Sequence, residues 1–220
     1  MNDIKAILFD VYGTLISTGN GSVEAARRIL EKNNASINPV EFYAHWKKLH
    51  KRNMQSDIFM PERDVFRDDL RELYTIYNIG GDYTEDITIM LQSLYDRTAF
   101  PETRSVLEAL RGKCALILAS NTDTEPLMQN LAVNGLEFDS IFTSESLQCY
   151  KPCRKFYERV LEETGYSAAE VLFVGDSGEE DAAAPKRFGM KTVLIDRKMT
   201  GACFGQDYTF ADLTGLLMLS

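Results

Sequence analysis

The sequence contains no long hydrophobic run, and its stretches of consecutive apolar residues are far shorter than the roughly 20 residues needed to span a bilayer. The first ten residues, MNDIKAILFD, lack the extended apolar core and small-residue cleavage site of a secretion signal. We therefore expect a cytoplasmic protein that does not act at a membrane.

Positive charge is also scarce. The chain has 24 Lys and Arg against 33 Asp and Glu, for a formal net charge of −9, which disfavours nonspecific binding to nucleic acid. Four cysteines occur without a CxxC pair, and only two histidines accompany them, which argues against a zinc site and favours reduced thiols. An anionic substrate would have to be attracted by local positive charge.

What the sequence does contain is a series of short apolar runs, each followed by a polar or small residue. Continuous rather than alternating hydrophobicity is typical of strands that are buried on both faces of a parallel sheet. The runs predicted to be strands are residues 6–9, 115–119, 141–142, 171–174 and 192–195.

Helical patterns separate the later runs, and this alternation predicts an α/β fold: a Rossmann-like parallel sheet sandwiched by helices. The segment 16–99 is different, because it holds four helical patterns and no convincing strand. We predict that residues 1–15 and 100–220 form the core domain and that residues 16–99 form an inserted helical cap domain. Aromatic residues at near-helical spacing in this segment, among them Phe42, Trp46 and Phe66, are expected to pack inside the cap.

Residues able to carry chemistry follow several of the predicted strands. Asp10, Ser120 and Asp176 lie at strand ends, and Lys151 lies in the loop after the run at 141–142. Ligands of parallel α/β sheets bind beyond the carboxyl ends of the strands. One such residue would mean little, since Asp at a strand end often caps a turn, but four of them in this order predict a shared site.

Four segments carry a resemblance to a known family. The motifs FDVYGTL (residues 9–15), ASN (119–121), YKP (150–152) and FVGDSGEEDAAAPKRFGM (173–190) resemble the four ordered motifs of haloacid dehalogenase-like hydrolases. With the helical insert after the first motif, the resemblance covers nearly the whole chain.

The resemblance implies a role for each matching position. Asp10 would be the nucleophile and form a covalent aspartyl intermediate, which splits one difficult step into two easier ones. Thr14 and Ser120 would hydrogen-bond the reacting group, and Asn121 would be a further substrate contact. Lys151 would offset the negative charge gathered by the nucleophile and the substrate.

The resemblance also implies a Mg²⁺ site. Asp10, the backbone carbonyl of Tyr12 and Asp176 would be ligands, because Mg²⁺ prefers a few oxygen ligands together with water and substrate oxygens. Asp181 would lie in the outer shell or orient the lysine. Whether Glu180 or Asp181 is the second functional acid remains open, and we prefer Asp181.

The first motif departs from the phosphatases of this family, which usually carry an acid at the position of Tyr12. A tyrosine is a poorer general acid than a carboxylic acid, and its ring would instead line the substrate pocket. The DxYGT form resembles 2-haloacid dehalogenases, whose halide leaves without protonation and which need no metal. Those enzymes lack the acid retained here as Asp176, and Lys47 stands where their cap has a halide-binding arginine.

Two acids at one buried site would be costly without a cation. This consideration favours a Mg²⁺-dependent phosphatase acting on a small organophosphate. The alternatives are a metal-independent 2-haloacid dehalogenase and a catalytically degenerate binding module. The expected partner is a small anionic molecule, and the protein is expected to be a monomer or a homodimer.

Overall fold

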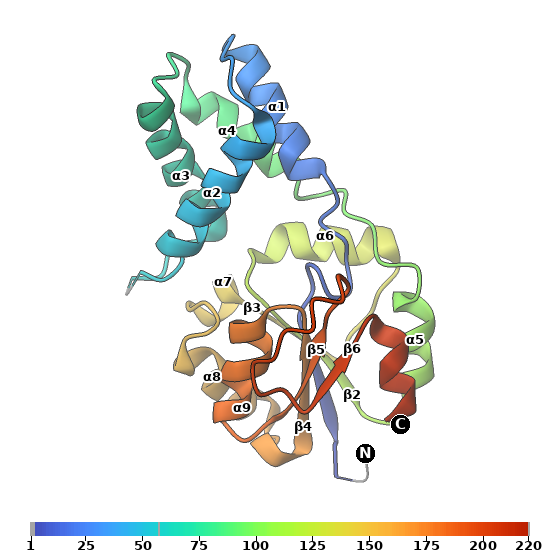
Figure 1. Cartoon of the computed structure of the whole chain (residues 1–220). Coiled ribbons are helices and arrows are strands. Elements are labelled where there is room, and N and C mark those ends of the chain that lie inside the picture. The colour runs from blue at the N-terminus through green and yellow to red at the C-terminus, as the bar shows by residue number, and fades with distance from the viewer. Residues whose placement is uncertain (1–2, 57, 220) are drawn as a thin grey trace. The chain divides into compact units, whose positions relative to one another are not determined.

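The computed structural model of the chain describes residues 3–56 and 58–219, and its central feature is a six-stranded sheet (Figure 1). The strand order is β3-β2-β1-β4-β5-β6, and every neighbouring pair is parallel. The strands are β1 (Ala6–Phe9), β2 (Ala115–Ser120), β3 (Ser140–Thr143), β4 (Val171–Gly175), β5 (Lys191–Ile195) and β6 (Tyr208–Phe210).

The predicted α/β fold with a parallel sheet is confirmed. All five apolar runs form strands, and the sixth strand, β6, was not predicted. Its sequence, Tyr-Thr-Phe, is too short to give a hydrophobic run, and its residues lie at an edge of the sheet with exposed or half-buried side chains. An edge strand does not need the two apolar faces that mark the central strands.

Helices cover both faces of the sheet (Figure 1). On one face, alternate residues of β1 and β4, including Leu8 and Phe173, belong to the same buried cluster as Phe156 and Tyr157 of helix α8 (Arg154–Thr164). On the other side lies α5. The helices of this part of the chain are α5 (Thr103–Leu110), α7 (Ser144–Leu147), α8 (Arg154–Thr164) and α9 (Ala184–Arg187), together with a π-helical segment at Gly178–Ala183.

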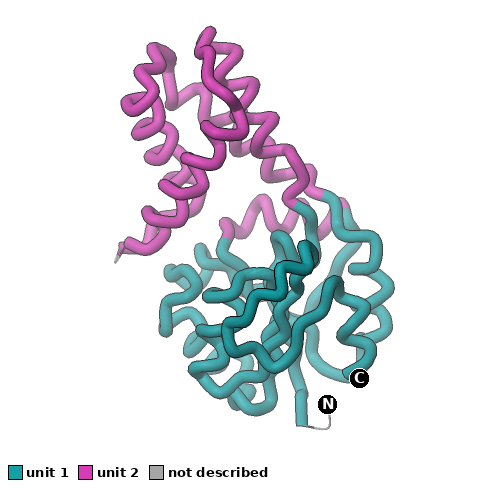
Figure 2. The backbone as a smooth tube through the Cα atoms, viewed as in Figure 1, with its two compact units in different colours: residues 1–17, 98–121, 134–220 teal, residues 18–97, 122–133 magenta. Residues whose placement is uncertain are grey.

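The chain divides into two compact units (Figure 2). The first contains Met1–Ser17, Thr98–Asn121 and Asn134–Ser220, and therefore the whole sheet. The second contains Thr18–Arg97 and Thr122–Val133. Its helices are α1 (Gly21–Lys32), α2 (Pro39–Asn53), α3 (Glu62–Tyr77), α4 (Tyr83–Gln92) and most of α6 (Thr124–Asn134).

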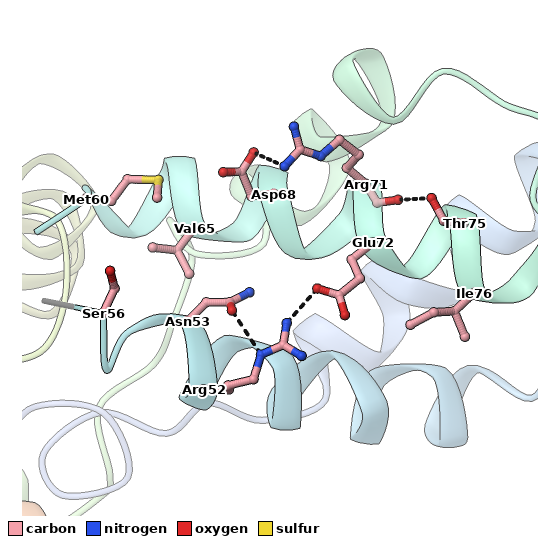
Figure 3. Close-up of a pocket in the computed structure, with 10 residues that line it drawn as sticks. All are labelled: Arg52, Asn53, Ser56, Met60, Val65, Asp68, Arg71, Glu72, Thr75 and Ile76. Carbon is pink, nitrogen blue, oxygen red and sulfur yellow. Dashed lines mark hydrogen bonds and ion pairs between the residues drawn. The ribbon is translucent and has the colours of Figure 1, made fainter. Parts of the chain in front are cut away.

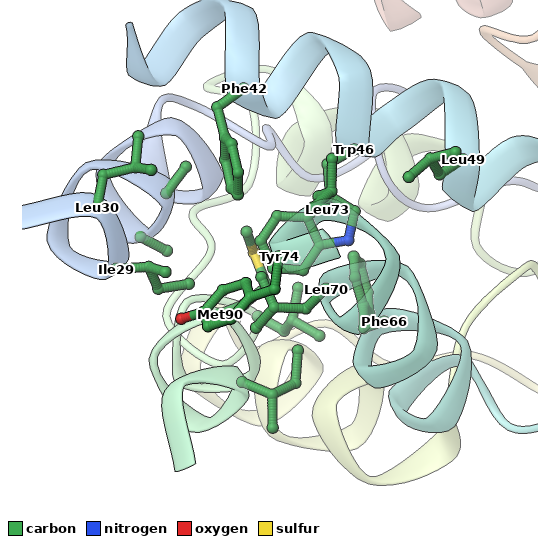
Figure 4. Close-up of a cluster of buried hydrophobic side chains, with 14 residues drawn as sticks. Ile29, Leu30, Phe42, Trp46, Leu49, Phe66, Leu70, Leu73, Tyr74 and Met90 are labelled. Carbon is green, nitrogen blue, oxygen red and sulfur yellow. The ribbon is translucent and has the colours of Figure 1, made fainter. Parts of the chain in front are cut away.

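The helices of the second unit enclose a hydrophobic cluster of their own (Figure 4). Phe42 and Trp46 from α2 are fully buried in it beside Phe66 and Leu70 from α3, so the expectation that the cap aromatics pack together is confirmed. Within the described residues, no helix combines the length and the apolar character that a bilayer crossing requires.

A partly buried ionic cluster joins α2 to α3 in this unit. His50 Nδ1 lies 2.8 Å from Asp69 Oδ2, and His50 Nε2 lies 3.5 Å from Glu62 Oε1. The imidazole ring also stacks on Phe66, with ring centroids 4.1 Å apart. Burial lowers the pKa of His50, but the hydrogen bonds and charges of Asp69 and Glu62 outweigh burial and raise it to about 9.

This shift predicts a pH-dependent stability. Because the pKa of His50 is raised from 6.5 to about 9, the imidazolium contributes stability that is complete below 6.5 and is lost as the pH rises through 9. We expect a loss of about 3 kcal/mol in the free energy of unfolding across that window. In urea unfolding, His50→Gln should lose less free energy of unfolding between pH 6.5 and 9 than the wild type does. His45→Gln should show the same pH dependence as the wild type. Equal pH dependence in all three proteins would contradict the assignment.

Candidate active site

The carboxyl ends of three adjacent strands bring the first site residues together. Asp10 directly follows β1, which lies between β2 and β4 in the sheet. The register pairs Phe9 with Leu118 and with Val174, so Asp10 lies level with the ends of both neighbouring strands. The amide of Asp10 donates to Val174 O at 2.9 Å, which fixes the start of the loop that carries it.

Lys151 lies between two carboxylates. Its Nζ is 2.9 Å from Asp10 Oδ1 and 2.7 Å from Asp181 Oδ1, and its side chain is fully buried. Burial lowers the pKa of Lys151, but the charges of Asp10 and Asp181 outweigh it and raise the pKa above its ordinary value. The lysine therefore stays cationic and neutralises part of the negative charge at the site.

The second oxygen of Asp10 is held by Thr14, whose hydroxyl donates to Asp10 Oδ2 at 3.2 Å. Each carboxylate oxygen of Asp10 thus has one donor, Lys151 on Oδ1 and Thr14 on Oδ2. Two separate donors restrict rotation of the carboxylate, so its oxygens are oriented before a substrate arrives. Ser120 is buried at the end of β2, next to the strand that carries Asp10.

The side chain of Asn121, which was expected to contact substrate, bonds the backbone of Lys151. Its Nδ2 donates to Lys151 O at 2.9 Å, and its Oδ1 accepts from Lys151 N at 2.7 Å. The side-chain amide therefore holds the backbone of the lysine, and Nδ2 also lies 3.2 Å from Glu180 Oε2. A contact between Asn121 and substrate stays a prediction.

Asp176 and Asp181 lie beside Asp10, and each of the three residues has a carboxylate oxygen within 4.8 Å of the others. Asp181 is buried, bonds Lys151 and accepts a hydrogen bond from Ser177 N at 2.9 Å. Glu180 instead lies against Asn121. Of the two acids left open by the sequence, Asp181 is therefore the one in contact with the lysine.

Close packing at this edge depends on two glycines. Gly13 has φ of +96°, and a Cβ on it would lie 2.3 Å from Asp176 Oδ2. A Cβ on Gly175 would lie 2.3 Å from the carboxylate of Asp181. Any side chain at either position would push a carboxylate out of the acidic group.

Asp176 is exposed, in contrast to Asp10 and Asp181. Its carboxylate is nevertheless crowded, and desolvation followed by the negative charge of Asp10 raises the pKa of Asp176 to about 7. The repulsion within the acidic group is therefore relieved in part by proton uptake at Asp176 and by Lys151. The expectation that both acids would be buried is not met for Asp176, and the expected cation stays a prediction.

Tyr12 is half-buried in the turn between Asp10 and Thr14. The position where phosphatases of the family place an acid is thus part of the loop that carries the nucleophile. Tyr157, which lies in α8, donates its hydroxyl to Glu180 O at 2.5 Å. This tyrosine supports the backbone of the acidic loop.

A groove of about 560 Å³ also occurs in the second unit, between α2 and α3 (Figure 3). It contains the ion pair between Arg52 and Glu72, and its apolar lining includes Val65 and Ile76. None of the predicted site residues lines it, so its size alone does not make it the site of chemistry.

Comparison with known proteins agrees with the motifs. The family model described as haloacid dehalogenase-like hydrolase matches residues 4–189. Haloacetate dehalogenase H-2 of Moraxella sp. (strain B) is 29% identical over 204 residues, which cover 90% of this chain and 88% of that protein. YhcW of Bacillus subtilis, whose name records a provisional phosphatase assignment, is 28% identical over 214 residues, which cover 93% and 89% of the two chains.

Solved structures show the same fold. The crystal structure of the L-2-haloacid dehalogenase RSc1362 superposes with a TM-score of 0.83 at 23% identity and covers 99% of this chain and 98% of that one. Since the family model spans most of the sequence, and since its four motifs meet at one edge of the sheet, the chain belongs to the haloacid dehalogenase-like hydrolases.

Proposed function

We propose that this hydrolase uses Asp10 as a covalent nucleophile to break the carbon–halogen bond of a small 2-haloacid. The observation that carries the proposal is the orientation of the Asp10 carboxylate, with Lys151 at 2.9 Å from one oxygen and Thr14 at 3.2 Å from the other. The proposal replaces the phosphatase that the sequence favoured, because of the leaving group and the charges within the acidic group.

The chemistry needs only groups of this chain and water. A carboxylate oxygen of Asp10 attacks the carbon that bears the halogen, a carbon–oxygen ester bond forms, and halide leaves with the electrons of the broken bond. Water then adds to the carboxyl carbon of Asp10 and the ester bond at that carbon breaks. The 2-hydroxy acid leaves with one proton of the water on its new hydroxyl, the other proton passes to solvent, and the Asp10 carboxylate is restored. Lys151 stabilises the Asp10 carboxylate before attack and after hydrolysis.

The first reason is the leaving group. Halide departs without a proton, whereas an alkoxide needs a general acid whose contribution is typically about 10²–10⁴-fold. Tyr12 stands at the position of that acid and is poorly suited to the task at neutral pH. Relatives at comparable identity are named as dehalogenases, among them the (S)-2-haloacid dehalogenase of Xanthobacter autotrophicus.

The second reason is the electrostatics of the acidic group. Lys151 contacts Asp10 and Asp181, and Asp176 is exposed. The two buried carboxylates therefore have a cation of the chain itself between them, so the burial of Asp181 does not by itself require a metal.

A Mg²⁺-dependent phosphatase is the second candidate, and the grouping of Asp10, Asp176 and Asp181 within 4.8 Å specifically favours it. Carboxylate oxygens are suitable Mg²⁺ ligands, so the residues fit the ion. Asp10 and Asp176 would bind it, and Asp181 would lie in its outer shell or orient Lys151. A bound Mg²⁺ would supply charge neutralisation for a phosphoryl group. Within such a site, Thr14 and Lys151 would still orient the nucleophile.

One experiment separates the two functions. Chloride release from 2-chloropropionate and turnover of p-nitrophenyl phosphate are measured for the wild type and for Asp176→Asn, each with Mg²⁺ and with chelator. We expect chloride release that survives chelation and is retained in Asp176→Asn. Phosphate turnover that is lost on chelation and in Asp176→Asn, without chloride release, would replace the dehalogenase by the phosphatase.

A further inference from the structure

Arg197 lies after β5 and bonds the turn that follows the nucleophile Asp10. It lies two residues after β5, which is separated from β1 by β4. Its Nε donates to Gly13 O at 3.1 Å, and its Nη2 donates to Thr14 O at 2.6 Å. Both acceptors are backbone carbonyls of successive residues in the turn that follows Asp10.

The guanidinium is itself held in place. Arg197 Nη1 lies 2.8 Å from Glu102 Oε1, and these two side chains are only 20% and 16% exposed. The guanidinium carbon also lies 3.4 Å from the centre of the Phe100 ring. An arginine fixed by a carboxylate and an aromatic face presents its remaining N–H groups in one geometry, which a flexible lysine cannot do.

The backbone of the turn shows why these two bonds matter. Its amides converge on Val11 O, which accepts from Thr14 N at 3.3 Å, Leu15 N at 2.8 Å and Ile16 N at 2.9 Å. Leu15 O accepts from Phe100 N at 3.0 Å and from the Thr103 hydroxyl at 2.8 Å. The carbonyls of Gly13 and Thr14 are bonded by Arg197, so a side chain completes the hydrogen bonding of this turn.

We propose that Arg197 is a positioning residue for the nucleophile. By holding the carbonyl of Thr14, it fixes the backbone from which the Thr14 hydroxyl donates to Asp10 Oδ2 at 3.2 Å. By holding the carbonyl of Gly13, it fixes the residue that lies against Asp176. Arg197 acts on the reaction only through these backbone contacts. The role rests on the proposed function of Asp10.

The first arm of the test is kinetic and compares Arg197→Gln and Arg197→Lys with Lys198→Gln, which removes an exposed cation from the adjacent position. A misplacement of about 1 Å in a catalytic group can cost roughly 10²-fold in rate. We therefore expect kcat of Arg197→Gln to fall by about 10–100-fold with little change in KM. Arg197→Lys should recover only part of the rate, and Lys198→Gln should match the wild type.

Chemical rescue distinguishes positioning from general destabilisation. Methylguanidinium at millimolar concentration should restore part of the kcat of Arg197→Ala and leave Lys198→Gln unchanged. A wild-type kcat in Arg197→Gln, or an effect confined to KM, would overturn the proposal.

The second arm does not depend on activity. Hydrogen exchange of the amides at residues 14–16 should accelerate in Arg197→Gln, while exchange in the central strands β1 and β4 stays as in the wild type. Unchanged exchange in the turn, or a uniform acceleration throughout the chain, would overturn the proposal. If the wild type shows no turnover that depends on Asp10, the proposed function fails, but this exchange measurement still decides whether Arg197 holds the turn.

Discussion

Asp10→Asn is expected to lose turnover by roughly 10⁴–10⁶-fold, as loss of a covalent nucleophile does in other hydrolases. The substitution keeps the size of the side chain, and an amide oxygen can still accept a hydrogen bond from Lys151 or from Thr14. What it removes is the negative oxygen that forms the ester bond. The effect should appear in kcat on every substrate that the enzyme turns over.

The control for this variant is Asp3→Asn, which changes an exposed acid near the same end of the chain and should keep full activity. Steady-state kinetics should be combined with circular dichroism, since Asp10 is buried and loses a charge that faces Lys151. A folded Asp10→Asn protein that retains more than a small fraction of the rate would show that another group is the nucleophile.

Lys151→Met is expected to reduce both stability and activity. Its ammonium group is fully buried between Asp10 and Asp181, and removal of one partner from a buried ionic group typically costs about 3–5 kcal/mol. Methionine fills a similar volume, so the loss reports charge and hydrogen bonding rather than a cavity. A loss of one preorganised charge at a reacting group typically reduces kcat by roughly 10²–10³-fold.

The pH dependence of that stability loss identifies its cause. Burial followed by neighbouring negative charge raises the pKa of Asp181 well above its ordinary value. Without the lysine, protonation of Asp181 removes an uncompensated buried charge, so the difference from the wild type should shrink as the pH falls. Lys155→Met, which removes an exposed lysine, should unfold like the wild type. A stability loss that is equal at neutral and acidic pH would point to packing instead of charge.

The positions of Asp10, Ser120 and Asp176 at one edge of the sheet could be predicted, because hydrophobic runs mark the strands and parallel strands end on the same side. Lys151 could be placed near them only by its position in the motif order. Its distance of 2.7 Å from Asp181 depends on the folded loop after β3.

Contacts made by long polar side chains could not be predicted. Nothing in the local sequence indicates that Asn121 bonds the backbone of Lys151 or that Arg197 reaches Thr14, because each pair is far apart along the chain and is brought together by the sheet. The contact between His50 and Asp69 could not be predicted for the same reason, because the two residues lie on different helices, α2 and α3.

Helix ends also differed from the pattern. The pattern of residues 84–96 predicts one helix at the end of the cap, whereas α4 ends at Gln92 and the chain turns at Ser93. Glu179 to Phe188 reads as one helix from its composition, but its first part is π-helical, which places Asp181 against Lys151. Widened turns of this kind are frequent at functional sites and have no clear sequence signal.

The most direct test of the covalent dehalogenase mechanism is the fate of a water oxygen. Enzyme that has turned over 2-chloropropionate in oxygen-18 water is digested, and the peptide that contains Asp10 is measured by mass spectrometry. Hydrolysis of an aspartyl ester at its carboxyl carbon places the label in Asp10. An unlabelled Asp10 after many turnovers, with the label found only in the product, would mean that water attacks the substrate directly and would contradict the covalent mechanism.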